Sequence, residues 1–349
     1  MKTSPRLLVL GYGNVAQALL PLLAARAEWM EAELGIRPLI SGIGSRRAGF
    51  FVHPTGWPST DPNTSASLLQ QFQQTGQPCE DALSFIRADH AAGANTLLEL
   101  TTLNPASGEP ALSHIRAALE AGMDVVTANK GPIAHAAASL HALAHARGIH
   151  LRYESTVMDG LPLLNLAEFT LPAVGIIGLR GLLNTTSSIV LRQVEEGQTL
   201  AEAIQLAQQI GVAEADPWHD LDGWDAAMKT TILANALFNT SLTPPAIQRT
   251  GIRDLAQAEI IASARSGSPI RLVSSARLIN GSASARVQPE RLLPSDPLYT
   301  ARDSGIVTLE TQAMGHISLI EHDTNVVQTA YGVLSDFITI QRAKKQSGS

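Results

Sequence analysis

Residues 6–16 read R-L-L-V-L-G-Y-G-N-V-A, a short apolar run that leads directly into a glycine-containing turn. An Ala- and Leu-rich segment with helical periodicity follows the turn. A strand, a glycine turn and a helix in this order form the dinucleotide-binding fingerprint, in which Ala16 takes the third glycine position. The segment therefore predicts a Rossmann-type domain at the start of an α/β chain.

The turn at residues 11–16 has the composition that a pyrophosphate site needs. Gly11 permits the tight turn, and Gly13 lets the backbone approach the pyrophosphate, which the N-terminus of the following helix attracts. We therefore expect the cofactor to be bound by Gly11, Gly13, Asn14, Val15 and Ala16. A glycine turn in another kind of α/β unit is the alternative, and the position directly after an apolar strand argues against it.

The second predicted strand, residues 38–43, ends in Gly44-Ser45-Arg46-Arg47. An acidic residue at this end would hold the ribose 2′-hydroxyl of NAD, and the sequence has none there. Arg46 and Arg47 could instead bind the 2′-phosphate of NADP. The sequence therefore favours NADP, with NAD as the other possibility and two solvated loop arginines as the alternative interpretation.

Further alternating elements complete the nucleotide-binding half. Strands are predicted over 96–102, 124–127 and 149–153, and helices over 67–72, 80–88 and 110–121. We expect Thr101 and Thr102, at the end of the first of these strands, to contact the cofactor. Glu99 is an unexpected charge within the same apolar run, and the sequence offers no account of it.

Lys130 follows the predicted strand 124–127 closely. Open α/β sheets bind their ligands at the carboxyl ends of the strands. A lysine at that edge could bind a carboxylate, a carbonyl or a phosphate. An ordinary exposed lysine before a helix is the alternative.

The region 153–324 is expected to form a second, α+β domain, which contains the acids and the lysine considered below as a catalytic site. Helices are predicted over 162–169, 200–210 and 225–237, and strands over 176–183, 270–276, 283–287, 305–313 and 316–320. The alternating apolar residues of these strands indicate a largely antiparallel sheet. The last element, 327–343, has helical periodicity, and residues 344–349 are expected to form a disordered tail. Residues 1–152 are assigned to the first domain.

Residues 211–229 read G-V-A-E-A-D-P-W-H-D-L-D-G-W-D-A-A-M-K and contain five carboxylates, one histidine and one lysine. Asp222 at the cap and Asp225 three residues later predict the start of a helix. Asp225 and Lys229 are four residues apart, so they would share one face of that helix. Acids beside a lysine can bind an ammonium group and handle a proton in the same place.

An ordinary surface ion pair between Asp225 and Lys229 is the alternative. Glu214, which precedes Asp225 by eleven residues, and Lys130 in a motif of its own argue for a site instead. The other polar residues of this stretch have plainer interpretations, a turn at Asp216 and a solvated loop at His219 and Asp220.

Composition narrows the class of protein. With 349 residues and 45% hydrophobic content, the chain can form two domains with real cores. A net charge of −6 argues against nucleic acid or an anionic membrane as a general partner. Cys79 is the only cysteine, which excludes an intrachain disulfide and fits a cytoplasmic protein. We expect no signal peptide, because the apolar run near the start is short and soon interrupted by glycines, and no apolar run of about 18 residues occurs elsewhere.

Taken together, these motifs resemble the homoserine dehydrogenase family. The resemblance rests on the order and spacing of G-Y-G-N-V-A at 11–16, T-A-N-K-G-P-I-A at 127–134, Y-E-S-T-V at 153–157, A-E-A-D-P at 213–217 and D-L-D-G-W-D-A-A-M-K at 220–229. Residues 329–336 resemble the closing helix of the family, which returns to the nucleotide domain, so the resemblance implies that 325–343 joins residues 1–152. A short form is expected, without the regulatory domain or the aspartate-kinase segment of some members.

The resemblance implies reversible, NAD(P)-linked reduction of aspartate semialdehyde to homoserine, a step of threonine and methionine biosynthesis. It implies that Lys130 and Lys229 are the catalytic lysines, and that Glu214 and Asp225 hold the amino and hydroxyl ends of the substrate. It further implies a monovalent cation, Na⁺ or K⁺, near Glu154 and the carbonyl of Val157. A homodimer formed through the second sheet is also implied.

The sequence departs from the family pattern in three places. Met158-Asp159 replaces small residues in the cation loop, and N-T-T-S-S at 184–188 stands where the family has N-G-T-T-N. Residues 321–328, E-H-D-T-N-V-V-Q, replace a glycine-rich loop before the last helix.

Two other functions remain as alternatives. Another NAD(P)-dependent amino-acid or semialdehyde oxidoreductase could use the same two-domain plan, although an acylating enzyme would need a nucleophilic cysteine and Cys79 is poorly placed for that role. A cofactor-binding sensor without turnover would need only the nucleotide half, and the lysines and acids of the second half argue against it.

Overall fold

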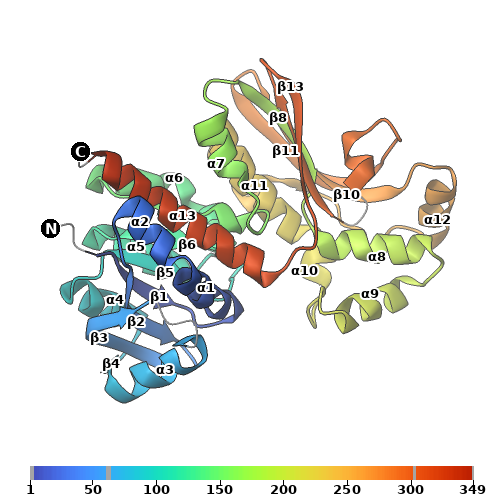
Figure 1. Cartoon of the computed structure of the whole chain (residues 1–349). Helices are drawn as coiled ribbons and strands as arrows, with labels where there is room; N and C mark the ends of the chain where they lie inside the picture. Colours follow the sequence, from blue (N-terminus) through green and yellow to red (C-terminus); the bar gives the residue numbers. More distant parts are fainter. Residues whose placement is uncertain (1–3, 60–63, 302–303, 348–349) are drawn as a thin grey trace. The chain divides into compact units, whose positions relative to one another are not determined.

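The computed structural model describes residues 4–59, 64–301 and 304–347, which form two compact units (Figure 1). Unit 1 comprises residues up to Pro162 and those from Asn325 onward, and unit 2 comprises Leu163–Thr324. The boundary lies ten residues later than residue 152, where the sequence predicts it. The reason is the 3₁₀ helix η1 (Glu154–Thr156), which is bound to the last helix of unit 1.

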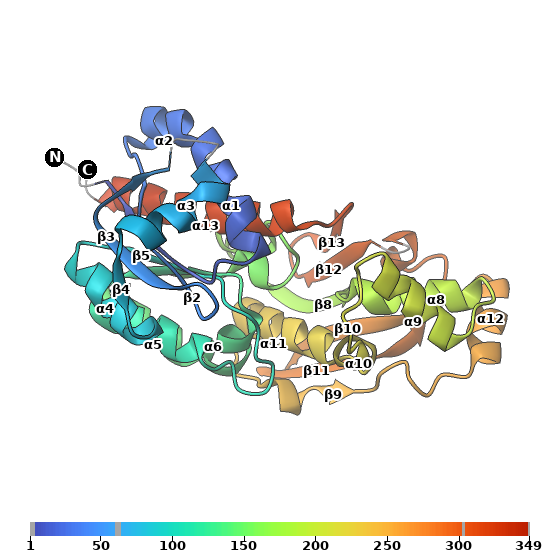
Figure 2. The ribbon, with the colours of Figure 1, turned by 90° about the horizontal axis from the view of Figure 1, so that it is seen from below.

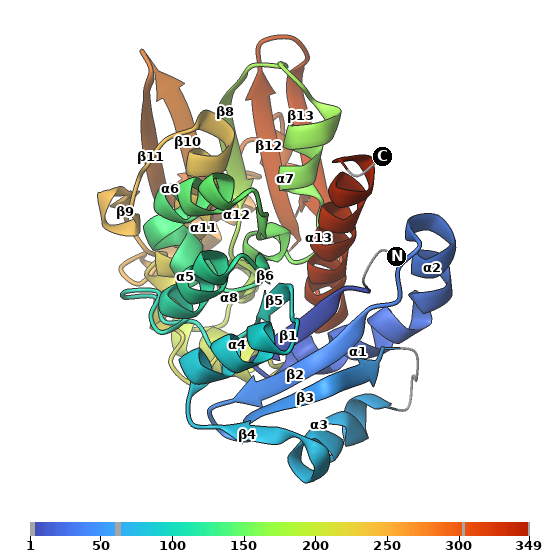
Figure 3. The same ribbon diagram turned by 90° about the vertical axis from the view of Figure 1, so that its left-hand side faces the viewer.

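Unit 1 is built on a seven-stranded sheet with the order β4-β3-β2-β1-β5-β6-β7 (Figure 3). The strands are β1 (Arg6–Leu10), β2 (Leu39–Ser45), β3 (Gly49–Pro58), β4 (Gln77–Cys79), β5 (Thr96–Glu99), β6 (Asp124–Thr127) and β7 (Leu151–Arg152). β1, β2, β5, β6 and β7 are parallel, whereas β3 and β4 extend the sheet in antiparallel fashion. The parallel part is the expected Rossmann-type arrangement.

The helices of unit 1 flank this sheet. They are α1 (Asn14–Ala25), α2 (Ala27–Leu34), α3 (Thr64–Thr75), α4 (Ala82–Ala91), α5 (Ala111–Ala121), α6 (Lys130–Arg147) and α13 (Val326–Ser347). α13 packs beside α1 (Figure 1), and Val333 and Phe337 of α13 share one buried cluster with Leu19 and Leu23 of α1. The last helix of the chain therefore completes the core of the first unit.

The prediction of a disordered tail is wrong for residues 344–347, which continue α13. Lys344 Nζ pairs with the buried carboxylate of Asp124, and Lys345 Nζ donates a hydrogen bond to the carbonyl oxygen of Glu33 (2.6 Å). Periodic apolar residues end before this point, so the sequence pattern gives no sign of these polar anchors. Residues 348–349 lie outside the described part of the chain.

Unit 2 contains a six-stranded sheet with the order β13-β12-β8-β10-β11-β9. The strands are β8 (Ile176–Leu182), β9 (Gln248–Arg249), β10 (Ile270–Ile279), β11 (Ser282–Arg291), β12 (Gly305–Thr311) and β13 (Gly315–Glu321). All neighbours are antiparallel except β9 and β11. The expected antiparallel second sheet is thus present.

The helices of unit 2 pack against its sheet and against one another (Figure 2). They are α7 (Leu163–Asn165), continued by a π-helical turn η2 (Leu166–Thr170), α8 (Thr185–Glu195), α9 (Leu200–Gln209), α10 (Trp218–Leu221), α11 (Trp224–Phe238) and α12 (Gln257–Arg265), with 3₁₀ turns η3 (Pro244–Ala246) and η4 (Pro297–Ala301). α8 was not predicted, and it lies beside α9 (Figure 2). Within the described ranges, no helix combines the length and the apolar character needed to cross a membrane.

Asp89 in α4 is a fully buried carboxylate, and its Oδ2 accepts a hydrogen bond from Ser41 Oγ (2.9 Å). Burial raises the pKa of Asp89 to about 7, against the opposing effects of this hydrogen bond and of the Arg6 charge. Between its ordinary pKa of 3.8 and a pH of about 7, the folded protein holds the Asp89 proton and the unfolded chain does not. The free energy of unfolding therefore falls as the pH rises through this window.

Asp89→Asn is expected to match the wild-type stability within about 1 kcal/mol at pH 4 and to exceed it by about 2–4 kcal/mol at pH 8. Asn has nearly the same size and carries no charge at either pH. Urea unfolding at both pH values measures the difference. Asp81→Asn is the control, because Asp81 is an exposed helix cap whose pKa is lowered by hydrogen bonds from Ser84, and it should show no gain at pH 8. An equal effect of Asp89→Asn at both pH values would contradict the prediction.

Candidate active site

Three neighbouring strands of unit 1 end in one row. In the register of the sheet, Leu10 of β1 pairs with Glu99 of β5, and Glu99 pairs with Thr127 of β6. The chain passes from β1 to β2 on one side, and after β4 it crosses back to β5 on the other side of β1. This edge is the topological switch point of the sheet, where open α/β folds bind their ligands.

Gly11 follows β1 with a left-handed backbone (φ +100°). A Cβ at this position would lie 2.6 Å from the amide nitrogen of Thr101 and closer still to the carbonyl group of Leu100. Only glycine lets the loops after β1 and β5 approach so closely. The tight turn expected from the sequence is therefore present.

Gly13 precedes the first turn of α1 and faces open space, with no described heavy atom within 4 Å of a Cβ placed there. By helix geometry, the amides of the first turn, at Asn14, Val15 and Ala16, have no partner inside the helix. In the described structure no side chain caps this end. Open space in front of free amides at a helix N-terminus fits a pyrophosphate.

Arg46 and Arg47 lie in the tight turn between β2 and β3, directly after the carboxyl end of β2. Both side chains are exposed. Ser45 Oγ accepts a hydrogen bond from the amide of Ala48 (3.1 Å) and closes the turn. The two guanidinium groups therefore occupy the end of the second strand, where a dinucleotide places its ribose.

Lys130 is the first residue of α6, and Asn129 caps that helix. Asn129 Oδ1 accepts a hydrogen bond from the amide of Gly131 (3.1 Å), and its Nδ2 donates one to the carbonyl oxygen of Thr101 (3.1 Å). The structure thus brings the expected residues Thr101 and Lys130 into adjoining loops of unit 1.

Glu154 and Val157, the expected cation ligands, are both buried around η1. The amide of Glu154 donates a hydrogen bond to Asp336 Oδ2 (2.7 Å). Asp159, one of the departures from the family pattern, accepts a hydrogen bond from Thr329 Oγ1 (2.9 Å). Among the described residues, no group of three or more His, Cys, Asp or Glu side chains is arranged to hold a metal ion.

In unit 2, Asp225 and Lys229 share one face of α11, as the sequence predicts. Lys229 Nζ lies 3.3 Å from Asp225 Oδ2 and donates a hydrogen bond to the carbonyl oxygen of Leu183 (2.7 Å). The side chains of Lys229 and Asp225 are only 19% and 8% exposed. This pair is therefore not an ordinary solvated surface ion pair.

Asn184 connects this pair to a second carboxylate. Its Nδ2 donates hydrogen bonds to Asp225 Oδ2 (3.0 Å) and to Asp220 Oδ1 (2.8 Å). Its Oδ1 caps α8 by accepting a hydrogen bond from the amide of Ser187 (2.8 Å). Thr186 Oγ1 donates to Asp220 Oδ2 (2.9 Å). The carboxylates and the lysine are thus held in a fixed arrangement of charges.

The sequence matches known proteins over almost its whole length. The family model of homoserine dehydrogenase matches residues 162–338. The chain is 35% identical over 344 residues to an NAD(+)-dependent homoserine dehydrogenase of Pseudomonas canavaninivorans, an alignment that covers 98% of this chain and 97% of the relative. The chain belongs to the homoserine dehydrogenase family.

Other homoserine dehydrogenases agree with this assignment. The one of Sulfurisphaera tokodaii is 31% identical, covering 97% of this chain and 99% of the relative. The crystal structure of a putative homoserine dehydrogenase from Archaeoglobus fulgidus superimposes with a TM-score of 0.83 at 25% identity, covering 97% of this chain and 99% of that one. A hyperthermophilic archaeal homoserine dehydrogenase mutant in complex with NADPH has the same fold, with a TM-score of 0.81 and 24% identity over 98% of both chains.

The family and activity expected from the sequence motifs are confirmed. The chain is an NAD(P)-dependent oxidoreductase that reduces L-aspartate 4-semialdehyde to L-homoserine. The fold class, with a parallel-stranded nucleotide sheet and a second sheet, is that of homoserine dehydrogenase structures.

Three polar residues of unit 2 differ from their sequence interpretation. Asp222 does not cap α11, whose N-cap is Gly223 with a left-handed backbone (φ 80°); its carboxylate binds Arg253 at 2.9 and 2.6 Å instead. His219 and Asp220 do not lie in a solvated loop, because both belong to α10, and Asp220 is bound to Asn184 and Thr186. The arginine and the hydroxyl that bind these acids are distant in sequence, so local pattern could not reveal them.

Glu214 lies in the exposed loop between α9 and α10. Its backbone carbonyl accepts a hydrogen bond from Gln208 Nε2 (3.1 Å). In the described part of unit 2, its carboxylate does not contact the hydrogen-bonded group formed by Asn184, Asp220, Asp225 and Lys229. The structure therefore brings together Asp225 and Lys229 and leaves Glu214 at the surface of the same unit.

Proposed function

We propose that Lys229 donates the proton, oriented by Asp225, when aspartate 4-semialdehyde is reduced. The contacts of Lys229 Nζ with the Leu183 carbonyl and the Asp225 carboxylate carry this proposal. A largely buried ammonium group with two fixed partners keeps one orientation, and proton transfer depends on such positioning. The acid beside it also stabilises the charged form from which the proton is donated.

A nicotinamide cofactor held at the glycine turn of residues 11–16 would supply the hydride that forms the new C–H bond at the aldehyde carbon as the carbonyl π-bond breaks. Negative charge then develops on the substrate oxygen. Lys229 stabilises this charge and transfers one Nζ proton to the oxygen, which gives the hydroxyl of homoserine. The neutral amine regains its proton from solvent, and in the reverse reaction it accepts the hydroxyl proton.

The remaining polar residues are proposed to hold the substrate. Asp225 and Glu214 have the charge that binds an α-ammonium group and can accept a hydrogen bond from the hydroxyl. Lys130 is proposed as the second catalytic lysine, either as the proton donor in place of Lys229 or as the partner of the substrate carboxylate. The position of Lys130 at the capped start of α6 supports a fixed role.

An absorbance assay of the purified protein with homoserine and NADP⁺ or NAD⁺ tests the reaction directly. We expect reduced cofactor to accumulate only when homoserine is present. Binding of the cofactor without any turnover would overturn the proposed function in favour of a sensor.

We propose that the chain prefers NADP over NAD, because Arg46 and Arg47 are exposed at the end of β2. Replacing both arginines with Asp is expected to weaken NADP⁺ binding at least about tenfold more than NAD⁺ binding, since a 2′-phosphate loses two cationic partners and meets two anions. Titration of each cofactor, followed by protein fluorescence, measures both Kd values.

The matched control is the pair Arg116→Asp and Arg147→Asp, which makes the same charge change at exposed positions of α5 and α6. It should affect the two cofactors alike. Equal weakening of NADP⁺ and NAD⁺ by the Arg46 and Arg47 variant would refute the 2′-phosphate argument.

We propose that Glu154 and the backbone carbonyl of Val157 bind a monovalent cation, Na⁺ or K⁺. Both residues are buried, and carboxylate and carbonyl oxygens are the ligands that hard cations prefer. Rates measured in NaCl, KCl and tetramethylammonium chloride at one ionic strength test the proposal. Equal rates in the three salts would contradict it.

We propose that the second sheet forms a homodimer interface. One face of β8 and β10, including Arg180, Arg277 and Ile279, lines an open groove of about 600 Å³, and Ile279 is 52% exposed. A self-complementary face is what a twofold dimer requires. Light scattering at assay concentration measures the mass, and a monomer would count against this interface.

A further inference from the structure

Glu99 is a buried carboxylate that the proposed reaction does not use. It is the last residue of β5, its side chain is fully buried, and it pairs in the sheet with Leu10 on one side and Thr127 on the other. A buried charge without partners is costly, so its contacts should explain its presence. The other side chains of β5 are buried as well, so an apolar residue would be expected at the position of Glu99.

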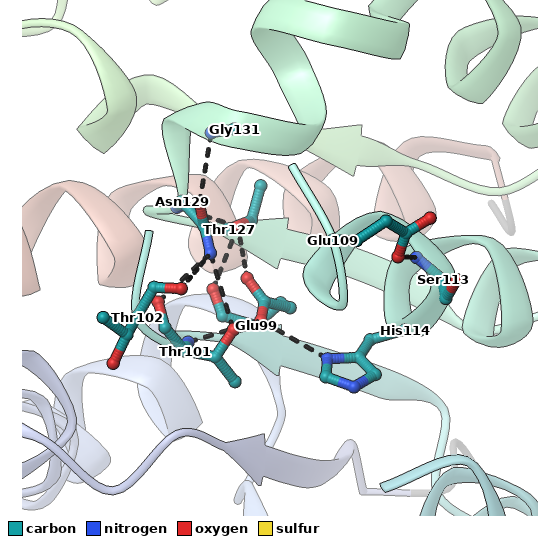
Figure 4. Close-up of polar contacts among 9 residues, drawn as sticks. All are labelled: Glu99, Thr101, Thr102, Glu109, Ser113, His114, Thr127, Asn129 and Gly131. Carbon is teal, nitrogen blue, oxygen red and sulfur yellow. Dashed lines mark hydrogen bonds and ion pairs between the residues drawn. The ribbon is translucent and has the colours of Figure 1, made fainter. Parts of the chain in front are cut away.

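The two oxygens of Glu99 bind two different loops. Oε1 accepts hydrogen bonds from the amide (3.3 Å) and from the hydroxyl of Thr101, in the loop after β5. Thr127 Oγ1, at the end of β6, lies 3.1 Å from Oε2 and 3.0 Å from the backbone carbonyl oxygen of Glu99, so its one proton is shared between these two acceptors. His114 of α5 approaches from the helix side, with Nδ1 3.7 Å from Oε1 (Figure 4). The carboxylate therefore joins the ends of β5 and β6.

Asn129 closes these contacts into a ring. Its amide donates a hydrogen bond to Thr127 Oγ1 (3.0 Å), and its side-chain nitrogen donates one to the carbonyl oxygen of Thr101 (3.1 Å). The ring thus runs from Glu99 to Thr101, Asn129, Thr127 and back to Glu99 (Figure 4). Charge-assisted hydrogen bonds at low dielectric hold such a ring rigidly.

The ring determines where the next residues of both loops lie. Asn129 caps α6, whose first residue is Lys130, so the direction in which Lys130 leaves the sheet depends on Asn129. The amide nitrogen of Thr101 is also one of the atoms that a Cβ on Gly11 would strike, at 2.6 Å, beside the closer carbonyl group of Leu100. The position of Thr101 therefore affects the cofactor turn as well as its own loop.

We propose that Glu99 is a positioning residue of the reductase reaction, which holds Thr101 and Lys130 in their working geometry through Thr127 and Asn129. The inference rests on the proposed function, in which Thr101 contacts the cofactor and Lys130 acts on the substrate. It gives Glu99 a role in the rate of hydride transfer, in addition to any role in stability. Displacing a catalytic group by about 1 Å can lower the rate by about 10²-fold.

Thr127→Val is the first test, because Val has the shape of Thr and lacks the hydroxyl that joins Glu99 to Asn129. Thr96→Val is the matched control: Thr96 is a fully buried residue at the other end of β5, and its hydroxyl donates a hydrogen bond to the neighbouring Asn95 Oδ1 (3.2 Å). The single-turnover rate of hydride transfer and the melting temperature are measured for both variants. We expect Thr127→Val to lower the rate about 10- to 100-fold and Thr96→Val to stay within about twofold of wild type at a similar loss of stability. Equal rates in the two variants would overturn the proposal.

Glu99→Gln is the second variant and serves if Thr127→Val does not fold. It keeps the size of the side chain and removes the charge and one acceptor, so the ring is weakened. Asp89→Asn makes the same carboxyl-to-amide replacement at another buried acid of unit 1 and should leave the rate within about twofold. A rate for Glu99→Gln as high as that of Asp89→Asn would also overturn the proposal.

A double variant separates this inference from the proposed function. If the ring acts by placing Lys130, Thr127→Val should have little further effect in a Lys130→Ala background. If Thr127→Val lowers the rate of hydride transfer by the same factor in the Lys130→Ala background as in wild type, with unchanged cofactor affinity, the ring has only a structural role. A Lys130→Ala variant with the wild-type rate would refute the proposed role of Lys130, whereas the comparison of Thr127→Val with Thr96→Val would still decide the role of Glu99.

Discussion

Lys229→Ala is expected to lower kcat for homoserine oxidation by a factor on the order of 10² to 10⁴, with the cofactor Kd within about twofold of wild type. The change removes the group that exchanges a proton with the substrate oxygen and stabilises its negative charge. Cofactor binding should persist, because the glycine turn, Arg46 and Arg47 all belong to unit 1 and are unaltered. Steady-state kinetics and cofactor titration measure the two quantities.

The variant also deprives the carbonyl oxygen of Leu183 of its hydrogen bond, so a loss of stability must be separated from a loss of chemistry. Lys345→Ala provides the comparison, since Lys345 Nζ likewise donates to a backbone carbonyl, that of Glu33. It should lower the melting temperature without lowering kcat. A Lys229→Ala variant that retains its activity would transfer the role of proton donor to Lys130.

Gly11→Ala is expected to destabilise the protein by about 3 kcal/mol or more and to weaken cofactor binding at least about 100-fold. The new methyl group would overlap the backbone of Leu100, in a conformation (φ +100°) that a residue with a side chain rarely adopts. The loops after β1 and β5 would have to separate, and the turn at which the pyrophosphate is expected would change with them. Chemical unfolding and cofactor titration measure the two effects.

Gly13→Ala is the matched comparison within the same turn. Its φ of −98° suits any residue, and the Cβ would meet no described atom within 4 Å, so stability should change by less than about 1 kcal/mol. Cofactor affinity should nevertheless fall, because the methyl group occupies the space by which the pyrophosphate approaches. Unchanged affinity of Gly13→Ala would show that the cofactor does not lie against this residue.

The parallel part of the nucleotide sheet could be predicted because each strand is a buried apolar run next to a helical pattern. β3 (Gly49–Pro58) could not, because its glycines and prolines read as turns. The structure explains how they are tolerated. β4 pairs only with Phe50, Phe51 and Val52, so Pro54 and Pro58 lie where β3 has no partner among the described strands on that side and needs no amide donor.

Contacts in the candidate site could be predicted between residues that are close in sequence. Contacts between residues that are distant in sequence could not. Asp225 and Lys229 are four residues apart and follow from helical geometry. Asn184 is 41 residues from Asp225, and Thr127 is 28 residues from Glu99, so only the folded chain shows that these residues are bound to each other. The sequence nevertheless shows Glu99 as a charge within an apolar strand, which indicates that it must have a hydrogen-bonding or charged partner in the fold.

The way α13 completes the core of unit 1 also constrains the order in which the protein can mature during synthesis. Val333 and Phe337 lie beside Leu19 and Leu23, yet the ribosome reaches them only after it has made the whole of unit 2. Unit 2 is one continuous segment and can fold as it emerges. Until α13 has been synthesised, unit 1 exposes the apolar surface that this helix covers. We therefore expect the nascent chain to depend most on chaperones during this interval.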